Sequence, residues 1–220
     1  MSAEISICVP CFNRSRVPSS AGLLELFPKC VDSLVAAARA SWIECELIVA
    51  DYRSDDWPLA DWLAERAWPI RAKVVTPHEK YTTGGGKNAA AELASAPVLF
   101  FCETDMLVPA NLLVRGLVVT GRGDGYFPYY QRYRGPEHDA AYWGNGCGNA
   151  VVLRDDWLEN KWIPSEGWGS GEDTLFSHWF WQRERLAREQ LLEFYHQWHP
   201  FAPIKAALEA VGGEHNERIA

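Results

Sequence analysis

Short apolar runs that alternate with helical segments in the first half of the chain constrain the fold more than any other feature. The apolar runs have the length of buried strands and are Ile5–Val9, Glu46–Ala50, Ile70–Val75 and Val98–Phe101. The segments between them predict helices over Pro28–Ala40, Leu59–Ala67 and Lys87–Ser95, the last opened by Gly84-Gly85-Gly86. Alternating strands and helices form a largely parallel sheet that helices cover on both faces. We therefore expect an α/β fold with a mostly parallel central sheet.

The second half of the chain is less regular. Its aromatic segment Tyr126–Tyr133 is expected to be partly extended, and Ala150–Arg154 and Leu191–Tyr195 predict strands. A helix is expected over Thr174–Arg188. Neither an internal repeat nor a linker divides the sequence, so we expect a single domain over residues 1–203, with residues 204–220 as a C-terminal helix or tail.

Composition excludes some function classes. The chain has 220 residues and a net charge of −8, which argues against nucleic-acid binding because a phosphate backbone attracts clustered lysine and arginine. No apolar run reaches the roughly 18 residues of a transmembrane segment, and the N-terminus lacks the pattern of a signal peptide. The six cysteines are interpreted as reduced thiols, although Cys8 and Cys11 form a C-x-x-C pair. These features predict a cytoplasmic protein.

Polar clusters directly follow three of the predicted strands. They are Asn13-Arg14, Asp51–Asp55 and Glu103–Asp105. In open α/β sheets, ligands bind beyond the carboxyl ends of the strands. The position that the clusters share predicts one ligand site at that edge of the sheet.

Glu103 and Asp105 form the most suggestive of these clusters. If the segment is extended, residues two apart point the same way, so both carboxylates would face one spot. Carboxylate oxygens suit Mg²⁺ or Mn²⁺. The same spacing occurs elsewhere in this acidic chain, and a polar strand end is the alternative interpretation. What distinguishes this pair is the apolar strand directly before it.

A second cluster ends the glycine-rich run Gly167-Trp168-Gly169-Ser170-Gly171-Glu172-Asp173. Glycine leaves room for a ligand, and tryptophan offers a flat face on which a sugar ring can stack. Glu172 and Asp173 stand where the predicted helix opens, a position that favours negative charge. A glycine-rich turn capped by an acidic residue, with Trp168 as ordinary packing, is the structural alternative.

These motifs, in this order, resemble those of glycosyltransferases with the GT-A fold, in particular family 2 and the carboxyl-terminal domain of galactosyltransferase family 7. The matching segments are Ile7–Arg14, Val49–Ser54, Gly86–Ala91, Glu103–Met106 and Gly167–Asp173. The resemblance implies a metal-dependent, inverting transfer of a sugar from a nucleotide-sugar donor, UDP-linked in our interpretation, to a saccharide or glycoconjugate hydroxyl. Three departures are Glu103, where aspartate is common, Tyr52-Arg53 between Asp51 and Ser54, and Lys87, where arginine is frequent.

The resemblance also implies roles for individual residues. Contacts to the nucleotide-sugar are expected from Pro10, Phe12, Asn13, Arg14, Asp51, Lys87, Glu103, Thr104 and Trp168. Asp105 is expected to bind the cation, Mn²⁺ or Mg²⁺, with Glu103 nearby or acting through water. Asp173 would be the general base, and Glu172 would hydrogen-bond the acceptor.

Two late histidines are candidate metal ligands, because neutral imidazole binds divalent metals. His196 is preferred over His199. In an extended segment the two side chains point to opposite faces, so at most one is expected to reach the cation.

Two other segments allow more than one interpretation. The tyrosines and arginines of Tyr126–Arg134 could line an acceptor groove, although a packed aromatic strand is the interpretation we favour. The glycines of Trp143–Asn149 could admit a sugar or simply turn the chain. For the whole protein, the alternatives to a glycosyltransferase are a sugar nucleotidyltransferase and a non-catalytic carbohydrate-binding module on the same scaffold. The nucleotidyltransferase is disfavoured because Pro10–Asn13 replaces a glycine-rich phosphate loop.

Overall fold

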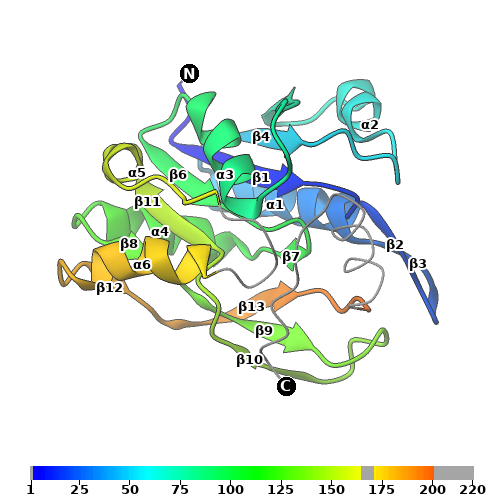
Figure 1. The fold of residues 1–220 in the computed structure, drawn as a ribbon. Helices are drawn as coiled ribbons and strands as arrows, with labels where there is room; N and C mark the ends of the chain where they lie inside the picture. The colour runs from blue at the N-terminus through cyan, green and yellow to red at the C-terminus, as the bar shows by residue number, and fades with distance from the viewer. Residues whose placement is uncertain (1, 165–170, 201–220) are drawn as a thin grey trace.

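A seven-stranded sheet runs through the centre of the molecule (Figure 1) in the computed structural model, which describes residues 2–164 and 171–200. The strand order is β12-β8-β11-β6-β1-β4-β5. The strands are β1 Ile5–Cys11, β4 Cys45–Asp51, β5 Arg71–Val75, β6 Val98–Phe101, β8 Gly125–Tyr126, β11 Ala150–Leu153 and β12 Leu186–Ala187. β1 is parallel to β4 and β6, whereas β11 is antiparallel to β6 and β8. The expected α/β sheet is therefore confirmed, with one antiparallel strand inside it.

Helices cover both faces of this sheet. They are α1 Leu26–Ser41, α2 Leu59–Glu65, α3 Thr83–Glu92, α4 Ala110–Thr120, α5 Arg154–Glu159 and α6 Glu172–Trp181. Successive β1 side chains point to opposite faces, so Ile7 packs into the core beneath α1 and α4 while Cys8 packs into the core beneath α3 and α6. Two apolar layers thus hold the central strands, and β1 and β4 are buried along their whole length.

A second, four-stranded sheet lies next to the central sheet (Figure 1). Its order is β10-β9-β13-β7, and its strands are β7 Met106–Leu107, β9 Tyr129–Tyr133, β10 Ala141–Gly144 and β13 Gln190–His196. In Figure 1 it lies below the central sheet, with β7 between the two. Because β7 begins directly after Asp105, the segment that follows β6 links the two sheets. A separate hairpin joins β2 Arg16–Ser19 to β3 Gly22–Glu25.

Two differences from the sequence-based expectations, at α3 and at α6, have clear physical causes. α3 begins at Thr83, so its glycines lie inside the helix. A Cβ on Gly84 would lie 2.5 Å from the Ile163 carbonyl oxygen, so only glycine permits this approach. α6 ends at Trp181 instead of Arg188, because the chain turns there and pairs as β12 and β13. α4, α5 and the β2–β3 hairpin were not predicted.

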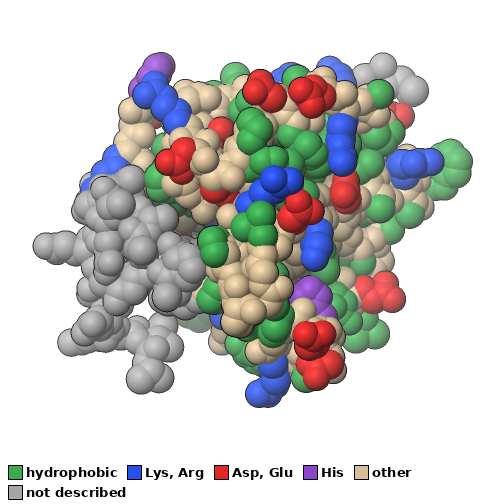
Figure 2. Space-filling model, turned by 90° about the vertical axis from the view of Figure 1, so that its right-hand side faces the viewer, with side chains coloured by type: hydrophobic (Ala, Val, Ile, Leu, Met, Phe, Trp, Pro, Cys, Tyr) green, Lys and Arg blue, Asp and Glu red, His purple; other side chains and the backbone are tan. Residues whose placement is uncertain are grey.

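The surface and the helices give two further observations. Figure 2 shows the side of the molecule at the right of Figure 1, where acidic, basic and hydrophobic side chains are interspersed. Within the described ranges, none of the helices has both the length and the apolar character that crossing a membrane requires.

Candidate active site

Asp105 lies at the centre of the candidate site, in the turn between β6 and β7. Its side chain is fully buried, and its Oδ2 lies 2.9 Å from Nη2 of Arg14. Burial alone would raise the pKa of Asp105, but the guanidinium and the two nearby imidazoles hold this pKa well below its usual range. Asp105 is therefore a carboxylate anion at neutral pH, which is the form that a cation binds.

His196 and His199 converge on the same carboxylate oxygen. Their Nε2 atoms lie 3.4 Å and 3.2 Å from Oδ2 of Asp105. The expectation that only one of them could reach this point is wrong. β13 ends at His196, and Gln197 then anchors the chain by donating its backbone N–H to the Asp105 carbonyl oxygen at 2.8 Å. Because β13 ends at His196, the alternation of side chains along a strand need not extend to His199.

The donor atoms of these three residues fit a divalent metal. One ligand atom from each lies within 4.8 Å of the others. Oδ1 of Asp105 is buried without a hydrogen-bond partner among the described residues, and such an orphaned oxygen calls for an unseen partner. Burial lowers the pKa of His196 to about 4, so its ring is neutral and keeps a lone pair for a metal. Two imidazoles beside one carboxylate suit a first-row transition ion better than Mg²⁺.

Glu103 lies beside this cluster but has different partners. Its backbone N–H donates to Oδ1 of Asn149 at 3.0 Å, and its carboxylate lies against Gly148, where a Cβ would come within 2.6 Å of Oε1. Burial raises the pKa of Glu103, whereas Lys87 opposes that rise. The extended geometry expected for Glu103–Asp105 is not found, because β6 ends at Phe101 and a turn follows.

Lys87 is buried beneath the loop that contains Cys147, Gly148 and Asn149. Its Nζ donates to the Gly148 carbonyl oxygen at 2.7 Å and lies 3.8 Å from the centre of the Trp162 ring. Burial lowers the pKa of Lys87, opposed by Glu103, Glu172 and Asp173. The negative charges of these three carboxylates thus favour the charged form of Lys87.

Asp173 lies in the first turn of α6, facing the same loop. Its Oδ2 accepts the backbone N–H of Cys147 at 3.2 Å, and its Oδ1 accepts that of Thr174 at 2.8 Å. The loop therefore joins Asp173, through Cys147 and Gly148, to Glu103. Gly148 allows the close approach of the Glu103 side chain, so whether the glycines of the Trp143–Asn149 segment also admit a sugar stays a prediction.

Hydrogen bonds join the loop that follows β1 to the loop that follows β4. The Ser54 hydroxyl donates to Oδ1 of Asp51 at 2.7 Å and accepts the Asn13 backbone N–H at 3.0 Å. Oδ1 of Asn13 accepts the Asp55 backbone N–H at 2.8 Å. Asn13 adopts a left-handed φ of 46°, which asparagine tolerates. These bonds fix the strand ends Cys11 and Asp51, which are register partners.

An aromatic cluster adjoins these loops. The rings of Phe12 and Tyr81 stack with centroids 5.2 Å apart, and Tyr52 meets Tyr81 edge-on at 5.1 Å. Gly86 fits closely beneath, because a Cβ there would lie 2.7 Å from the Pro10 Cβ. Tyr81 was not identified from sequence, since no motif marks it.

The remaining predicted site residues are placed as follows. Thr104 is buried in the turn beside Asp105, and Glu172 begins α6 next to Asp173. Trp168 and the tail over residues 204–220 lie outside the described residues, so their roles stay predictions. The same holds for the resemblance to galactosyltransferase family 7, which depends on the Gly167–Asp173 loop.

Comparison with known proteins identifies the family. Residues 6–165 match the sequence model of the family described as Glycosyl transferase family 2. The chain belongs to this glycosyltransferase family. No curated protein sequence matches it.

Solved structures share the fold of this family 2 chain. TarS 1–349 of S. aureus in complex with UDP-GlcNAc superposes with a TM-score of 0.68 at 15% identity, covering 90% of this chain and 59% of that one. The complex of the same fragment with UDP gives 0.65 at 15% identity, covering 97% and 67%. Full TarS gives 0.62 at 14% identity, covering 97% and 41%. The chain thus spans 59% of the fragment in the UDP-GlcNAc complex and less than half of TarS. At these identities the likeness establishes the GT-A fold.

Proposed function

We propose that this protein is a metal-dependent inverting glycosyltransferase that moves a sugar from a UDP-sugar to a hydroxyl of a saccharide or glycoconjugate. The observation that carries the proposal is the convergence of Asp105, His196 and His199, beside a loop that ties Glu103 to Asp173. The three converging side chains are assigned to a metal ion, and Asp173, on the far side of this loop, is assigned to the base. Membership of family 2 supports the reaction class.

The nucleotide is proposed to bind across the ends of β1 and β4. Phe12 offers an aromatic face there, and Asp51 and Asn13 offer polar groups on a rigid loop pair. The similar TarS structures contain UDP-GlcNAc and UDP, which supports a uridine donor. Hexose and N-acetylhexosamine donors are both compatible with these contacts.

A divalent cation is proposed to be held by Asp105, His196 and His199, with Mn²⁺ favoured over Mg²⁺ by the two imidazoles. Such an ion supplies Lewis-acid stabilisation of the negative charge on the leaving diphosphate. Arg14, whose Nη2 already lies at Oδ2 of Asp105, can turn to pair with a phosphate oxygen.

Asp173 is proposed as the general base. Two backbone N–H groups fix its carboxylate, and each oxygen retains a lone pair. The acceptor hydroxyl gives its proton to Asp173 as its oxygen bonds to the anomeric carbon, and the bond from that carbon to the diphosphate breaks. One such displacement inverts the anomeric configuration. Glu172 is proposed to orient the acceptor, and Trp168 to stack against the sugars.

A screen of UDP-sugars tests the proposal. Thermal unfolding is measured with each UDP-sugar in Mn²⁺ and again in EDTA, and UDP release is measured for the sugars that stabilise the protein. We expect stabilisation that requires the metal, and UDP release that an acceptor accelerates. Stabilisation without any UDP release would favour the non-catalytic module, and no response to any nucleotide sugar would refute the donor assignment.

A further inference from the structure

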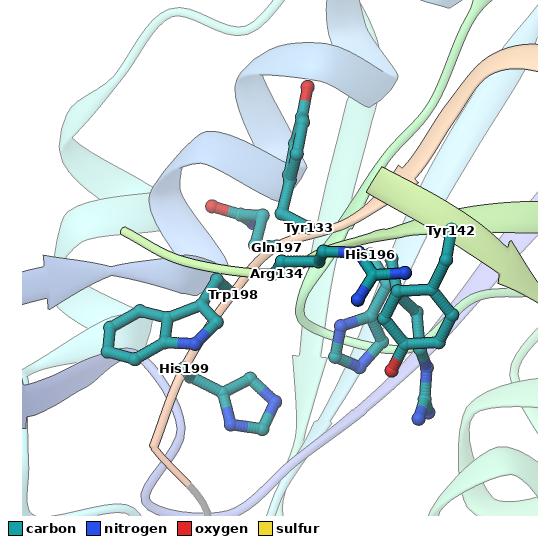
Figure 3. A pocket seen from close by; sticks show the side chains of 8 residues that line it. Tyr133, Arg134, Tyr142, His196, Gln197, Trp198 and His199 are labelled. Atoms are coloured by element: carbon teal, nitrogen blue, oxygen red, sulfur yellow. The ribbon is translucent and has the colours of Figure 1, made fainter. Parts of the chain in front are cut away.

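A cavity of about 470 Å³ opens beside the metal cluster, lined by β9, β10 and the segment after β13. Figure 3 shows His199 and Trp198 toward one side of it and His196 and Tyr142 toward the other. We propose that this cavity binds an oxyanion, a phosphate or carboxylate group, carried by the acceptor, so that the acceptor is an acidic saccharide. This inference depends on the proposed function.

The cavity faces the metal cluster because of strand register. Arg132 pairs with Tyr142 on β10 and with His196 on β13. Residues directly opposite each other on neighbouring strands present their side chains on the same face. Since His196 points at Asp105, Arg132 and Tyr142 project from that face as well. Arg134 directly follows β9, which ends at Tyr133, and also lines the cavity.

The charge of the lining is positive in an acidic protein. Arg132 and Arg134 contribute two guanidinium groups, and none of the described lining residues is acidic, although the chain carries a net charge of −8. Nε of Arg132 is buried without a hydrogen-bond partner among the described residues. A guanidinium binds phosphate or carboxylate through paired, charge-assisted hydrogen bonds. An oxyanion would satisfy that buried donor.

Aromatic rings beside the arginines suit a sugar. Tyr142 is 43% exposed, and the Arg134 guanidinium lies 5.1 Å from its ring centre. This stacking orients the guanidinium while leaving its N–H edges for a ligand. Tyr142 and Trp198 offer flat faces for a sugar ring.

Position indicates the acceptor as the source of the anion. The proposed nucleotide loops follow β1 and β4 of the central sheet, whereas the residues that line the cavity lie on or next to β9, β10 and β13 of the second sheet. Arg14 lies at Asp105 and can serve the donor phosphates. β10 leads from the cavity into Cys147, which holds Asp173. A ligand lying along β10 would therefore direct a hydroxyl toward the proposed base.

The test compares Arg132→Gln/Arg134→Gln with wild type, and Arg134→Gln with Arg122→Gln, which likewise removes one positive charge from an exposed position, after α4. Calorimetry with Mn²⁺ and saturating UDP measures binding of glucose 6-phosphate, glucuronate and neutral glucose. We expect both acidic sugars to bind wild type more tightly than glucose does. The double variant should bind the two acidic sugars at least tenfold more weakly than wild type. The dissociation constant for UDP should change less than twofold, and Arg122→Gln should behave as wild type.

Two results would overturn the inference. One is equal affinity of the double variant and wild type for both acidic sugars. The other is a loss that falls on UDP instead, since that would assign the arginines to the donor diphosphate. If the double variant does not fold, Arg134→Gln alone, at an exposed position, decides by the same measurements. Failure of wild type to bind UDP refutes the proposed donor, and the acidic sugars titrated without UDP still report on the cavity.

Discussion

Arg14 and a divalent cation should compete for Asp105. Nη2 of Arg14 lies 2.9 Å from Oδ2 of Asp105 and 3.1 Å from Nε2 of His199, so a guanidinium group contacts two of the three proposed ligands. Only 13% of the Arg14 side chain is exposed. A bound metal must therefore displace Arg14 or share this oxygen with it. Replacing Arg14 with glutamine removes the competing charge and keeps a polar side chain.

The size of the effect follows from the geometry. Two unit charges about 4 Å apart attract by about 4 kcal/mol at an effective dielectric constant of 20. A metal that displaces Arg14 must overcome this attraction. Hydration of the released guanidinium offsets part of that cost, but a remainder of about 1.4 kcal/mol already changes the dissociation constant for the metal tenfold. The variant also leaves a buried carboxylate without its counter-charge, and a cation would relieve that. We expect Arg14→Gln to bind Mn²⁺ at least tenfold more tightly than wild type.

Calorimetric titration with Mn²⁺ alone measures this directly. Arg16→Gln is the matched control, because Arg16 pairs with Glu25 on the β2–β3 hairpin instead of with the site. Asp105→Ala supplies the baseline without the carboxylate. Equal or weaker Mn²⁺ binding by Arg14→Gln would refute the reasoning, because Arg14 would then support the ligands and not compete for them.

Three further predictions concern catalysis and stability. Asp173→Asn should lower sugar transfer at least a hundredfold with UDP affinity unchanged; full turnover in a UDP-release assay would exclude Asp173 as base. Burial opposes ionisation of Glu46, but hydrogen bonds, first from Ser6, hold its pKa at about 2. Glu46→Gln should therefore lose about 1–3 kcal/mol at pH 7, and urea titrations should show this difference shrinking as pH falls from about 4.5 toward 2. Gly86→Ala should lower the free energy of unfolding by about 1–3 kcal/mol, because the new methyl group would collide with Pro10; unchanged unfolding in urea would contradict this. Gly123→Ala is the control for backbone strain without crowding, because a Cβ there meets no neighbouring atom within 4 Å and the residue has a φ of +88°.

The central sheet could be predicted because its signal is local. β1, β4 and β6 are apolar runs bounded by polar residues, and the positions where they end place Asn13, Asp51 and Glu103 at one edge. The residues at which helices and strands begin and end were less predictable, because tertiary packing sets them. The glycines of α3 are one example, because contacts with Ile163 and Pro10 explain why glycine is required there.

The site was predictable in its acidic residues and less so in its other partners. Asp105 and Asp173 stand in motifs, but nothing near Asn149 in the sequence shows that it holds Glu103. The position of His199 depends on where β13 ends, which in turn depends on the bond from Gln197 to Asp105. Such bonds join segments far apart in the chain, and their geometry has no local sequence signature.

The strands β1, β4, β5 and β6, the helices α1, α2 and α3 and the polar residues at the strand ends were determined by the sequence alone, because hydrophobic periodicity acts over a few neighbouring residues. Which side chains meet was decided only by the tertiary structure. Arg14 and His199 lie in separate parts of the chain and converge on one oxygen of Asp105. The second sheet brings Arg132 to the same face through its register with His196. Register and loop anchoring are set by packing of the whole domain.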